Sequence, residues 1–312
     1  MCPLAQRANT RTILTRKGGV PLGGTIGKGA LVGRPCCFEE VGFGADLVPL
    51  LAHRHISYMT RFPALVFSTF VALTVSQSAL AQDAPKPRCV ILLHGLARTD
   101  ASMLVMEHAL EAAGYKTVNQ DYPSRAAPVA LLADPALRSA REACAPDSTP
   151  DVVTHSMGAI LLRSFAADHP ELTWGRVVML GAPNHGSEII DRFGEYTAFQ
   201  AANGPAGLQL GTEGLPGTLP PVPFETGVIA GSQSLNPVLS AVVEGVDDGK
   251  VSIDSTRVEG MTAHLTLPVT HTFMMQNPRV IVQTRAFLDS GAFEPDLSMA
   301  EALRRLWRIG VD

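Results

Sequence analysis

The sequence predicts an α/β fold, with a mostly parallel central sheet and helices on both of its faces. The segment 89–93 reads Cys-Val-Ile-Leu-Leu, a short apolar run typical of a strand that is buried on both faces. The segment 101–113 spaces its Met and Leu residues at a helical period, and Gly114 follows it. Because such segments alternate along the chain, a parallel sheet with helical connections is expected.

The other expected elements continue this alternation. Strands are predicted over 116–119, 151–154 and 176–180, and more weakly over 225–231 and 263–267. Helices are predicted over 127–143, 159–168, 279–288 and 297–308. Pro128 and Pro135 are expected to limit the first of these helices, because proline lacks the N–H that a helix interior needs.

The segment 184–224 interrupts the alternation. It contains seven glycines and five prolines and has no clear helical or strand period. A stretch of this length without regular elements is usually a functional lid or a binding loop, and a surface insertion is the alternative.

The composition of the 312-residue chain supports a folded core and argues against some functions. Apolar residues make up 46% and charged residues 17% of it, which excludes global disorder. Residues 82–312 hold 17 Lys and Arg against 26 Asp and Glu, a formal net charge of −9. This acidic balance argues against nucleic-acid binding through phosphate neutralisation and gives no electrostatic reason for binding to anionic lipid.

Residues 59–81 have the layout of a secretory signal peptide. Arg61 supplies a positive charge, residues 64–75 are uncharged and mostly apolar, and residues 79–81 read Ala-Leu-Ala, a small-x-small cleavage pattern. The apolar run is short for a bilayer span, so cleavage is expected rather than an uncleaved anchor. The mature chain would then be one domain, 82–312, in the periplasm or secreted.

Residues 1–58 precede this signal peptide, although a secretory signal works at the N-terminus. They are basic and Gly-rich, and they show no sustained helical or strand period. We interpret them as the product of a start codon placed too early, and a genuine disordered extension is the alternative.

Two of the five cysteines, Cys89 and Cys144, fall within 82–312. In an exported protein two cysteines are expected to form a disulfide, and two buried free thiols are the alternative. Five cysteines are too few for a disulfide-built scaffold, and no CxxC pair indicates a zinc site.

A candidate nucleophile follows the strand predicted over 151–154. Residues 152–159 read Val-Val-Thr-His-Ser-Met-Gly-Ala, which places Ser156 at a sharp turn between a strand and a helix. This pattern resembles the G-x-S-x-G nucleophile elbow of α/β-hydrolases. Gly158 keeps the pattern, whereas Thr154 replaces the first glycine with a larger, β-branched residue. The alternative role for Ser156 is a helix N-cap.

Residues 90–96, Val-Ile-Leu-Leu-His-Gly-Leu, resemble the strand and His-Gly loop that build the oxyanion hole in the same family. The resemblance implies that the backbone N–H groups of Leu96 and Met157 stabilise the developing oxyanion. His94 lies before the turn, too early for an acid–base role, and is expected to be structural.

A general base is expected in the loop after the last predicted strand. His271 follows Pro268 and precedes the helix predicted over 279–288, which is where the family places its catalytic histidine. His264 lies at the start of an apolar run and is expected to be a strand residue.

The acid of the expected triad precedes the glycine of an Asp-Gly turn. Residues 246–252 read Val-Asp-Asp-Gly-Lys-Val-Ser and resemble the acid-bearing turn of bacterial lipases, which implies Asp248. A carboxylate is needed there to hold the imidazole in one tautomer. Asp247 and Asp254 are the alternatives, because Asp-Gly is also an ordinary turn dipeptide.

Residues 181–187, Gly-Ala-Pro-Asn-His-Gly-Ser, resemble the G-[AT]-P-x-x-G-S stretch of bacterial triacylglycerol lipases. His185 and Ser187 could mimic a catalytic pair, but a structural loop role is expected for them. The resemblance as a whole covers residues 88–290.

The order Ser156, Asp248, His271 along the chain is the order of the α/β-hydrolase triad. The resemblance implies an α/β-hydrolase fold with a lid-like insertion at 184–224. It also implies a serine carboxylester hydrolase of lipase or esterase type that forms an acyl-enzyme and needs no cofactor or metal, and the signal-like segment 59–81 predicts that it is exported. The expected partner is a small-molecule or lipid ester, and contact with a membrane would be transient.

Two other functions stay open. An acyltransferase or a phospholipid- or GPI-type deacylase would use the same triad, because the choice of acceptor depends on access to the pocket. A binding protein on a decayed hydrolase fold is the non-enzyme alternative, and the complete triad argues against it.

Overall fold

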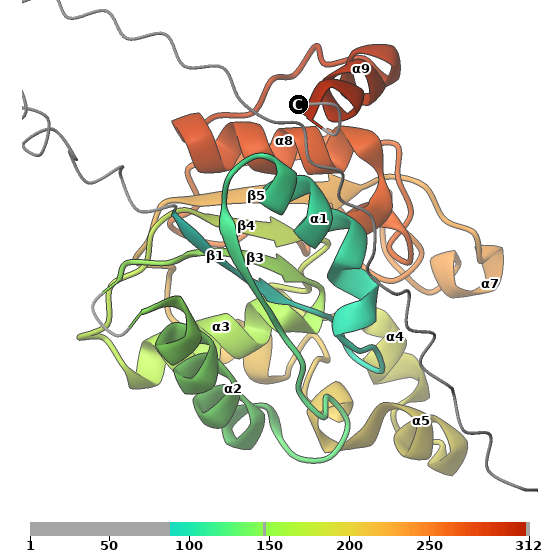
Figure 1. Cartoon of the computed structure of the whole chain (residues 1–312). Helices are drawn as coiled ribbons and strands as arrows, with labels where there is room; N and C mark the ends of the chain where they lie inside the picture. Colours follow the sequence, from blue (N-terminus) through green and yellow to red (C-terminus); the bar gives the residue numbers. More distant parts are fainter. Residues whose placement is uncertain (1–87, 146–147, 310–312) are drawn as a thin grey trace, which may run out of the picture. The chain divides into compact units, whose positions relative to one another are not determined.

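The computed structural model describes residues 88–145 and 148–309, and these residues contain a parallel sheet of six strands (Figure 1). The strands are β1 (Cys89–Leu93), β2 (Lys116–Gln120), β3 (Asp151–His155), β4 (Val177–Leu180), β5 (Thr226–Gly231) and β6 (Ala263–Leu267). Their order in the sheet is β2-β1-β3-β4-β5-β6, and each neighbouring pair is parallel. The predicted α/β fold with a parallel sheet is confirmed.

Helices cover both faces of the sheet (Figure 1). They are α2 (Val129–Cys144) and α3 (Met157–Asp168) on one face, and α1 (Leu104–Ala112) and α8 (Pro278–Ser290) on the other. Within β1, Ile91 and Leu93 pack into the core beside α2 and α3. Val90 and Leu92 alternate with them and pack into the core beside α1 and α8. The two-sided cover explains why the strand is apolar throughout.

The boundaries of α2 differ from the expectation at one proline. The helix begins directly after Pro128, as predicted, but it continues through Pro135 to Cys144, so the expected limit at Pro135 is wrong. Pro135 leaves the carbonyl of Leu131 without a helical donor. Leu131 is exposed, so water can bond that oxygen and the helix tolerates the proline.

The segment 184–224 contains three short helices, so the expectation that it lacks regular elements is wrong. They are α4 (Glu188–Phe193), α5 (Thr197–Leu208) and α6 (Leu215–Thr218). α5 bends at Gly204, whose φ of 64° is one that residues with a side chain rarely adopt. Short helices interrupted by glycine and proline carry no periodic apolar stripe, and periodicity therefore does not detect them.

The remaining elements are η1 (Asp100–Met103), α7 (Pro237–Ser240), η2 (Met274–Gln276) and α9 (Met299–Ile309). In the part of the chain that the structure describes, no helix combines the length and the apolar character that crossing a bilayer requires. The expected extension 1–58 and signal peptide 59–81 lie outside the described residues.

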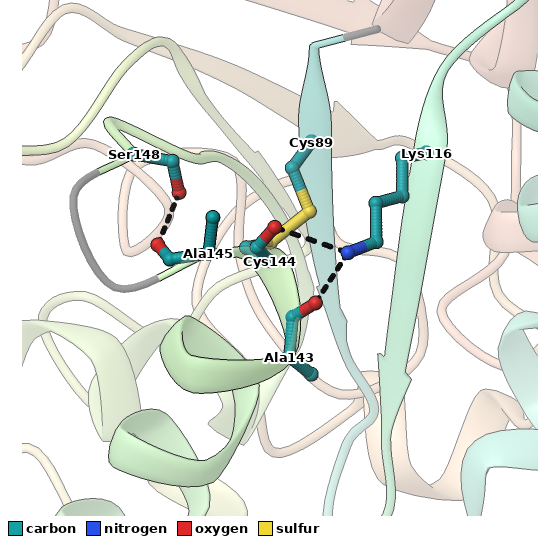
Figure 2. The surroundings of a disulfide bond; sticks show 6 residues. All are labelled: Cys89, Lys116, Ala143, Cys144, Ala145 and Ser148. Carbon is teal, nitrogen blue, oxygen red and sulfur yellow. Dashed lines mark hydrogen bonds between the residues drawn. A yellow bond between two sulfur atoms is a disulfide. The ribbon is translucent and has the colours of Figure 1, made fainter. Parts of the chain in front are cut away.

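A disulfide joins Cys89, at the start of β1, to Cys144, at the end of α2 (Figure 2). The Cα atoms of the two cysteines are 5.7 Å apart. Beside it, the Lys116 ammonium donates hydrogen bonds to the carbonyl oxygens of Ala143 and Cys144. A cation in this position complements the negative end of the helix dipole. The disulfide and the Lys116 hydrogen bonds both lie at the amino ends of the strands.

Replacing both Cys89 and Cys144 by serine should lower the free energy of unfolding by about 4 kcal/mol, because the bond closes a loop between residues 55 positions apart. Urea unfolding followed by circular dichroism measures this change. Lys116→Met is the matched control, since it removes hydrogen bonds at the same helix end but keeps the disulfide, and it should cost about 1 kcal/mol. Equal urea midpoints for the wild type and the double variant would contradict the prediction.

Candidate active site

Ser156 occupies the sharp turn between β3 and α3, and its side chain makes no capping hydrogen bond to the helix. Its φ of 53° and ψ of −124° are strained for a residue with a side chain. Gly158 permits the turn, because a Cβ atom there would lie 2.7 Å from the carbonyl oxygen of Leu93. Thr154, the departure from the elbow pattern, lies inside β3 and is fully buried, and its hydroxyl has no hydrogen-bond partner among the described residues.

The side chains of Ser156, His271 and Asp248 form one continuous chain of hydrogen bonds. The distance between Ser156 Oγ and His271 Nε2 is 2.9 Å, and that between His271 Nδ1 and Asp248 Oδ2 is 2.8 Å. An ionised carboxylate only accepts, so Nδ1 donates to it and Nε2 is left to accept the Ser156 hydroxyl proton. His271 is 3% exposed and Asp248 is 1% exposed, so water scarcely competes for these bonds.

Each of these three residues lies beyond the carboxyl end of a strand. Ser156 follows β3, Asp248 lies between β5 and β6, and His271 lies in the loop after β6. Because the strands are parallel, their carboxyl ends meet at the same edge of the sheet. The backbone N–H of His271 also donates to the carbonyl oxygen of Asp248 at 2.9 Å, which ties the two loops together.

The Asp248 carboxylate is oriented by its own turn. Its Oδ1 atom accepts hydrogen bonds from the backbone N–H groups of Lys250 and Val251, at 3.0 and 2.9 Å. Gly249 makes the turn with a φ of 100°, a conformation that favours glycine. With Oδ1 occupied in this way, Oδ2 is free to accept from His271.

The two alternative acids bind elsewhere. Asp247 Oδ1 accepts hydrogen bonds from the Ser240 hydroxyl and from a backbone N–H. The Asp254 side chain is 95% exposed and lies 3.7 Å from Arg257. The carboxylate that contacts His271 is the one that the Asp-Gly pattern singled out.

Two other histidines that stand out in the sequence have partners away from the nucleophile. His264 lies in β6, and its Nε2 atom is 2.8 Å from the Thr256 hydroxyl. His94 is fully buried, and its ring stacks on that of Tyr122 with 4.2 Å between the centroids.

Residues 181–187, the stretch after β4, begin next to the side chains of Asp248 and His271. His185 is exposed, and the Ser187 hydroxyl donates to a backbone carbonyl oxygen at 2.7 Å. Gly181 has a φ of 54°, and a Cβ atom there would lie 3.1 Å from His271 Nδ1 and 3.0 Å from Asp248 Oδ2. Glycine at this position therefore leaves room for the imidazole and the carboxylate to meet.

The two backbone donors that the resemblance implies are Leu96, in the loop after β1, and Met157, the first residue of α3. Among the described residues, no hydrogen bond uses the N–H of Leu96 or of Met157. Ala97 has a φ of 54°, and its N–H donates to the Ser124 hydroxyl at 3.0 Å. The Tyr122 hydroxyl donates to the carbonyl two residues before Leu96. These contacts fix the loop, which passes next to the nucleophile at Gly95, where an added Cβ atom would lie 3.1 Å from the Cβ atom of Ser156.

His155, the residue before the nucleophile, contacts the loop of His271, and no sequence pattern indicates this contact. Its Nε2 atom donates to the backbone carbonyl oxygen of His271 at 3.0 Å, and the two rings lie 4.9 Å apart. Burial lowers the pKa of His155 well below its ordinary value. His155 thereby supports the loop that carries the imidazole, and only its tertiary contact reveals this.

A cavity of about 220 Å³ opens beside Ser156 and His271. Its apolar wall is formed by Leu96, Ile189, Ile190, Phe199, Leu210, Leu239 and Val251. The segment 184–224 supplies four of these side chains, which places its helices α4 and α5 against the nucleophile.

A second, more open hollow of about 920 Å³ adjoins the first, and Arg98 lines both. The second hollow is lined by more polar side chains, including Asp121, Ser124 and Arg125. Within residues 88–145 and 148–309, no three His, Cys, Asp or Glu side chains are grouped as metal ligands would be.

No family model matches the chain, and no curated protein is similar enough in sequence to match it. Among solved structures, the mature lipase BlEst2 of Bacillus licheniformis is 18% identical with a TM-score of 0.54, over 67% of this chain and 94% of that one. Phospholipase PlaB from Legionella pneumophila is 15% identical with a TM-score of 0.51, over 71% and 63%. Lipase B of Aspergillus fumigatus is 16% identical with a TM-score of 0.53, over 70% and 57%.

At these identities the likeness concerns the fold. The chain spans nearly the whole of the Bacillus lipase but less than two thirds of the Legionella and Aspergillus proteins. The parallel sheet, the strained turn after β3 and the three matches lead to the same assignment: the chain has the α/β-hydrolase fold.

Proposed function

We propose that this protein is a serine ester hydrolase of the lipase or esterase type, which acts through an acyl-enzyme on Ser156. The observation that carries the proposal is the hydrogen-bonded chain from Asp248 through His271 to Ser156, which ends at a cavity with an apolar wall. The solved structures with the same fold include two lipases and a phospholipase, which supports ester chemistry for this fold.

Acylation begins with the hydroxyl of Ser156. His271 Nε2 accepts the proton while Oγ attacks the ester carbonyl carbon, and the carbonyl electron pair moves onto oxygen. The N–H groups of Leu96 and Met157 stabilise this oxyanion. The pair then re-forms the carbonyl, the bond to the alcohol oxygen breaks, and the imidazolium donates its proton to that oxygen. The products are the free alcohol and acyl-Ser156.

Deacylation repeats these steps with water. His271 accepts a proton from the water as its oxygen attacks the acyl carbon, and the oxyanion again lies against the same two N–H groups. The bond to Ser156 Oγ breaks, and Oγ recovers the proton from the imidazolium, which releases a carboxylic acid. Throughout, Asp248 holds the imidazole in one tautomer and stabilises its positive charge.

A fluorophosphonate probe tests the assignment directly, because it phosphonylates a serine only where a general base and an oxyanion hole activate the hydroxyl. Peptide mapping by mass spectrometry should find the probe on Ser156. Protein denatured before labelling is the control and should not react. A labelled serine elsewhere, or no label on the folded protein, would contradict the proposal.

We also propose export, with cleavage after Ala81. The signal-like segment 59–81 supports it, and so does the disulfide between Cys89 and Cys144, because such bonds persist in oxidising compartments. N-terminal sequencing of the native protein should begin at Gln82. A mature N-terminus within residues 1–58 would refute this.

A further inference from the structure

Two cationic side chains, Arg98 and Lys250, line the same cavity as Ser156. Each belongs to a loop that also carries a residue with a proposed role in catalysis. Arg98 comes two residues after Leu96, and Lys250 comes two residues after Asp248, whose carboxylate accepts its backbone N–H. Their place beside the nucleophile is therefore set by the loops that build the site.

Neither of these two charged groups forms an ion pair with a carboxylate in the described part of the chain. Among the described residues, no carboxylate oxygen lies within 4.0 Å of the Arg98 guanidinium or the Lys250 ammonium, although the guanidinium groups of Arg88, Arg176 and Arg305 all have such partners. The Arg98 guanidinium donates to the carbonyl oxygen of Thr272 at 3.0 Å, which fixes its position but leaves its charge in place.

The charges of Arg98 and Lys250 act on each other and on His155, the residue before the nucleophile. Loss of water around its ammonium and then the charge of Arg98 lower the pKa of Lys250, and the carboxylate of Asp248 opposes this shift. After burial and the charge of His271, the charges of Arg98 and Lys250 also lower the pKa of His155, which precedes Ser156. Two cations that repel each other across a cavity favour a ligand that brings a negative charge between them.

The shape of the site indicates which part of an ester carries that charge. The apolar wall from α4 and α5 suits an acyl chain, whereas Arg98 also lines the open, more polar hollow beside the cavity. The departing alcohol has room where the cavity opens toward that hollow, beside Arg98. Resting on the proposed ester hydrolysis, we propose that the alcohol portion of the substrate carries an anionic group, a phosphate or a carboxylate, which binds Arg98 and Lys250.

Matched esters test this proposal on the full chain. The first pair is 1-hexanoylglycerol 3-phosphate and 1-hexanoylglycerol, and the second is O-hexanoylglycolate and 2-hydroxyethyl hexanoate. Within a pair only the anion on the alcohol differs, and released hexanoate measures kcat/KM. The anionic member should be preferred by about ten- to a hundredfold, the range of a charge-assisted hydrogen bond. A preference in either pair supports the proposal, and the pair that responds identifies the anion.

Variants assign the preference to the two cations. Lys250→Gln should lower the ratio of anionic to neutral kcat/KM by about tenfold, and Arg98→Gln should lower it as well. Arg138→Gln removes the same charge from the exposed surface of α2 and should leave the ratio unchanged. Because the ratio is taken within each variant, a general loss of activity does not affect it.

Three results would overturn the proposal. The first is an equal kcat/KM for both members of both pairs, and the second is a preference for the anionic member that persists in Lys250→Gln and in Arg98→Gln. The third is a preference only for an anion on the acyl side, which is measured by comparing 4-nitrophenyl hydrogen adipate with 4-nitrophenyl hexanoate. If turnover of neutral esters depends on Ser156 while no preference exists, the proposed function stands and this inference fails. If no ester is hydrolysed, both fail.

Discussion

Ser156→Ala should lower kcat for p-nitrophenyl esters by about 10⁴-fold or more while leaving the protein folded. The variant removes the oxygen that lies 2.9 Å from His271 Nε2, so no acyl-enzyme can form. The residual rate would come from the oxyanion donors and the cavity, which remain. Steady-state release of p-nitrophenol gives kcat, and thermal unfolding shows whether the fold is intact.

His185→Asn is the matched control for this prediction. His185 belongs to the His-Gly-Ser stretch that mimics a catalytic pair, yet it is exposed. The variant should keep kcat within about threefold of the wild type, as expected for a surface position. Wild-type activity in Ser156→Ala would remove the basis of the enzyme assignment.

Asp248→Asn should lower kcat by about 10⁴-fold near neutral pH, the size of the corresponding change in other triads. The turn explains the effect. The backbone N–H groups of Lys250 and Val251 require an acceptor at the Oδ1 position, so the amide oxygen lies there and the NH₂ group replaces Oδ2. His271 Nδ1 must then accept, its proton moves to Nε2, and Nε2 can no longer take a proton from the nucleophile.

Asp247→Asn is the matched control for this change. Asp247 adjoins Asp248 in the chain, but its Oδ1 atom accepts from Ser240 and from a backbone N–H, and an amide oxygen can keep both bonds. Its kcat should stay within about tenfold of the wild type, because the triad is untouched. If Asp247→Asn lost as much activity as Asp248→Asn, the assignment of the acid would be wrong.

The sequence predicts the strands, the main helices and the positions of Ser156 and His271 because each has a local cause. Val152 and Val153 are buried between helices, so the strand before Ser156 is apolar, and the turn after it needs Gly158. His271 follows the last strand of the sheet, which separates it from a histidine within that strand.

Other features depend on contacts between distant segments, and no local pattern encodes them. The preference for Asp248 over its neighbour rested on resemblance, whereas the structure assigns it through the backbone N–H groups that occupy Oδ1. The bond from His155 to the backbone of His271 joins residues 116 positions apart. The convergence of Arg98 and Lys250 on one cavity likewise requires two loops to be folded against each other.

The stabilising cross-link and the proposed catalytic residues lie at opposite ends of the parallel strands. The disulfide and the Lys116 contacts fasten the amino ends of the strands, whereas Ser156 and His271 follow carboxyl ends. Substitutions that raise stability to heat or denaturant can therefore be made at the amino ends of the strands, away from the catalytic residues at the carboxyl ends. By the same argument, a thiol reductant should shorten the time for which the protein stays folded and active, and it should have less effect on the rate of a single turnover.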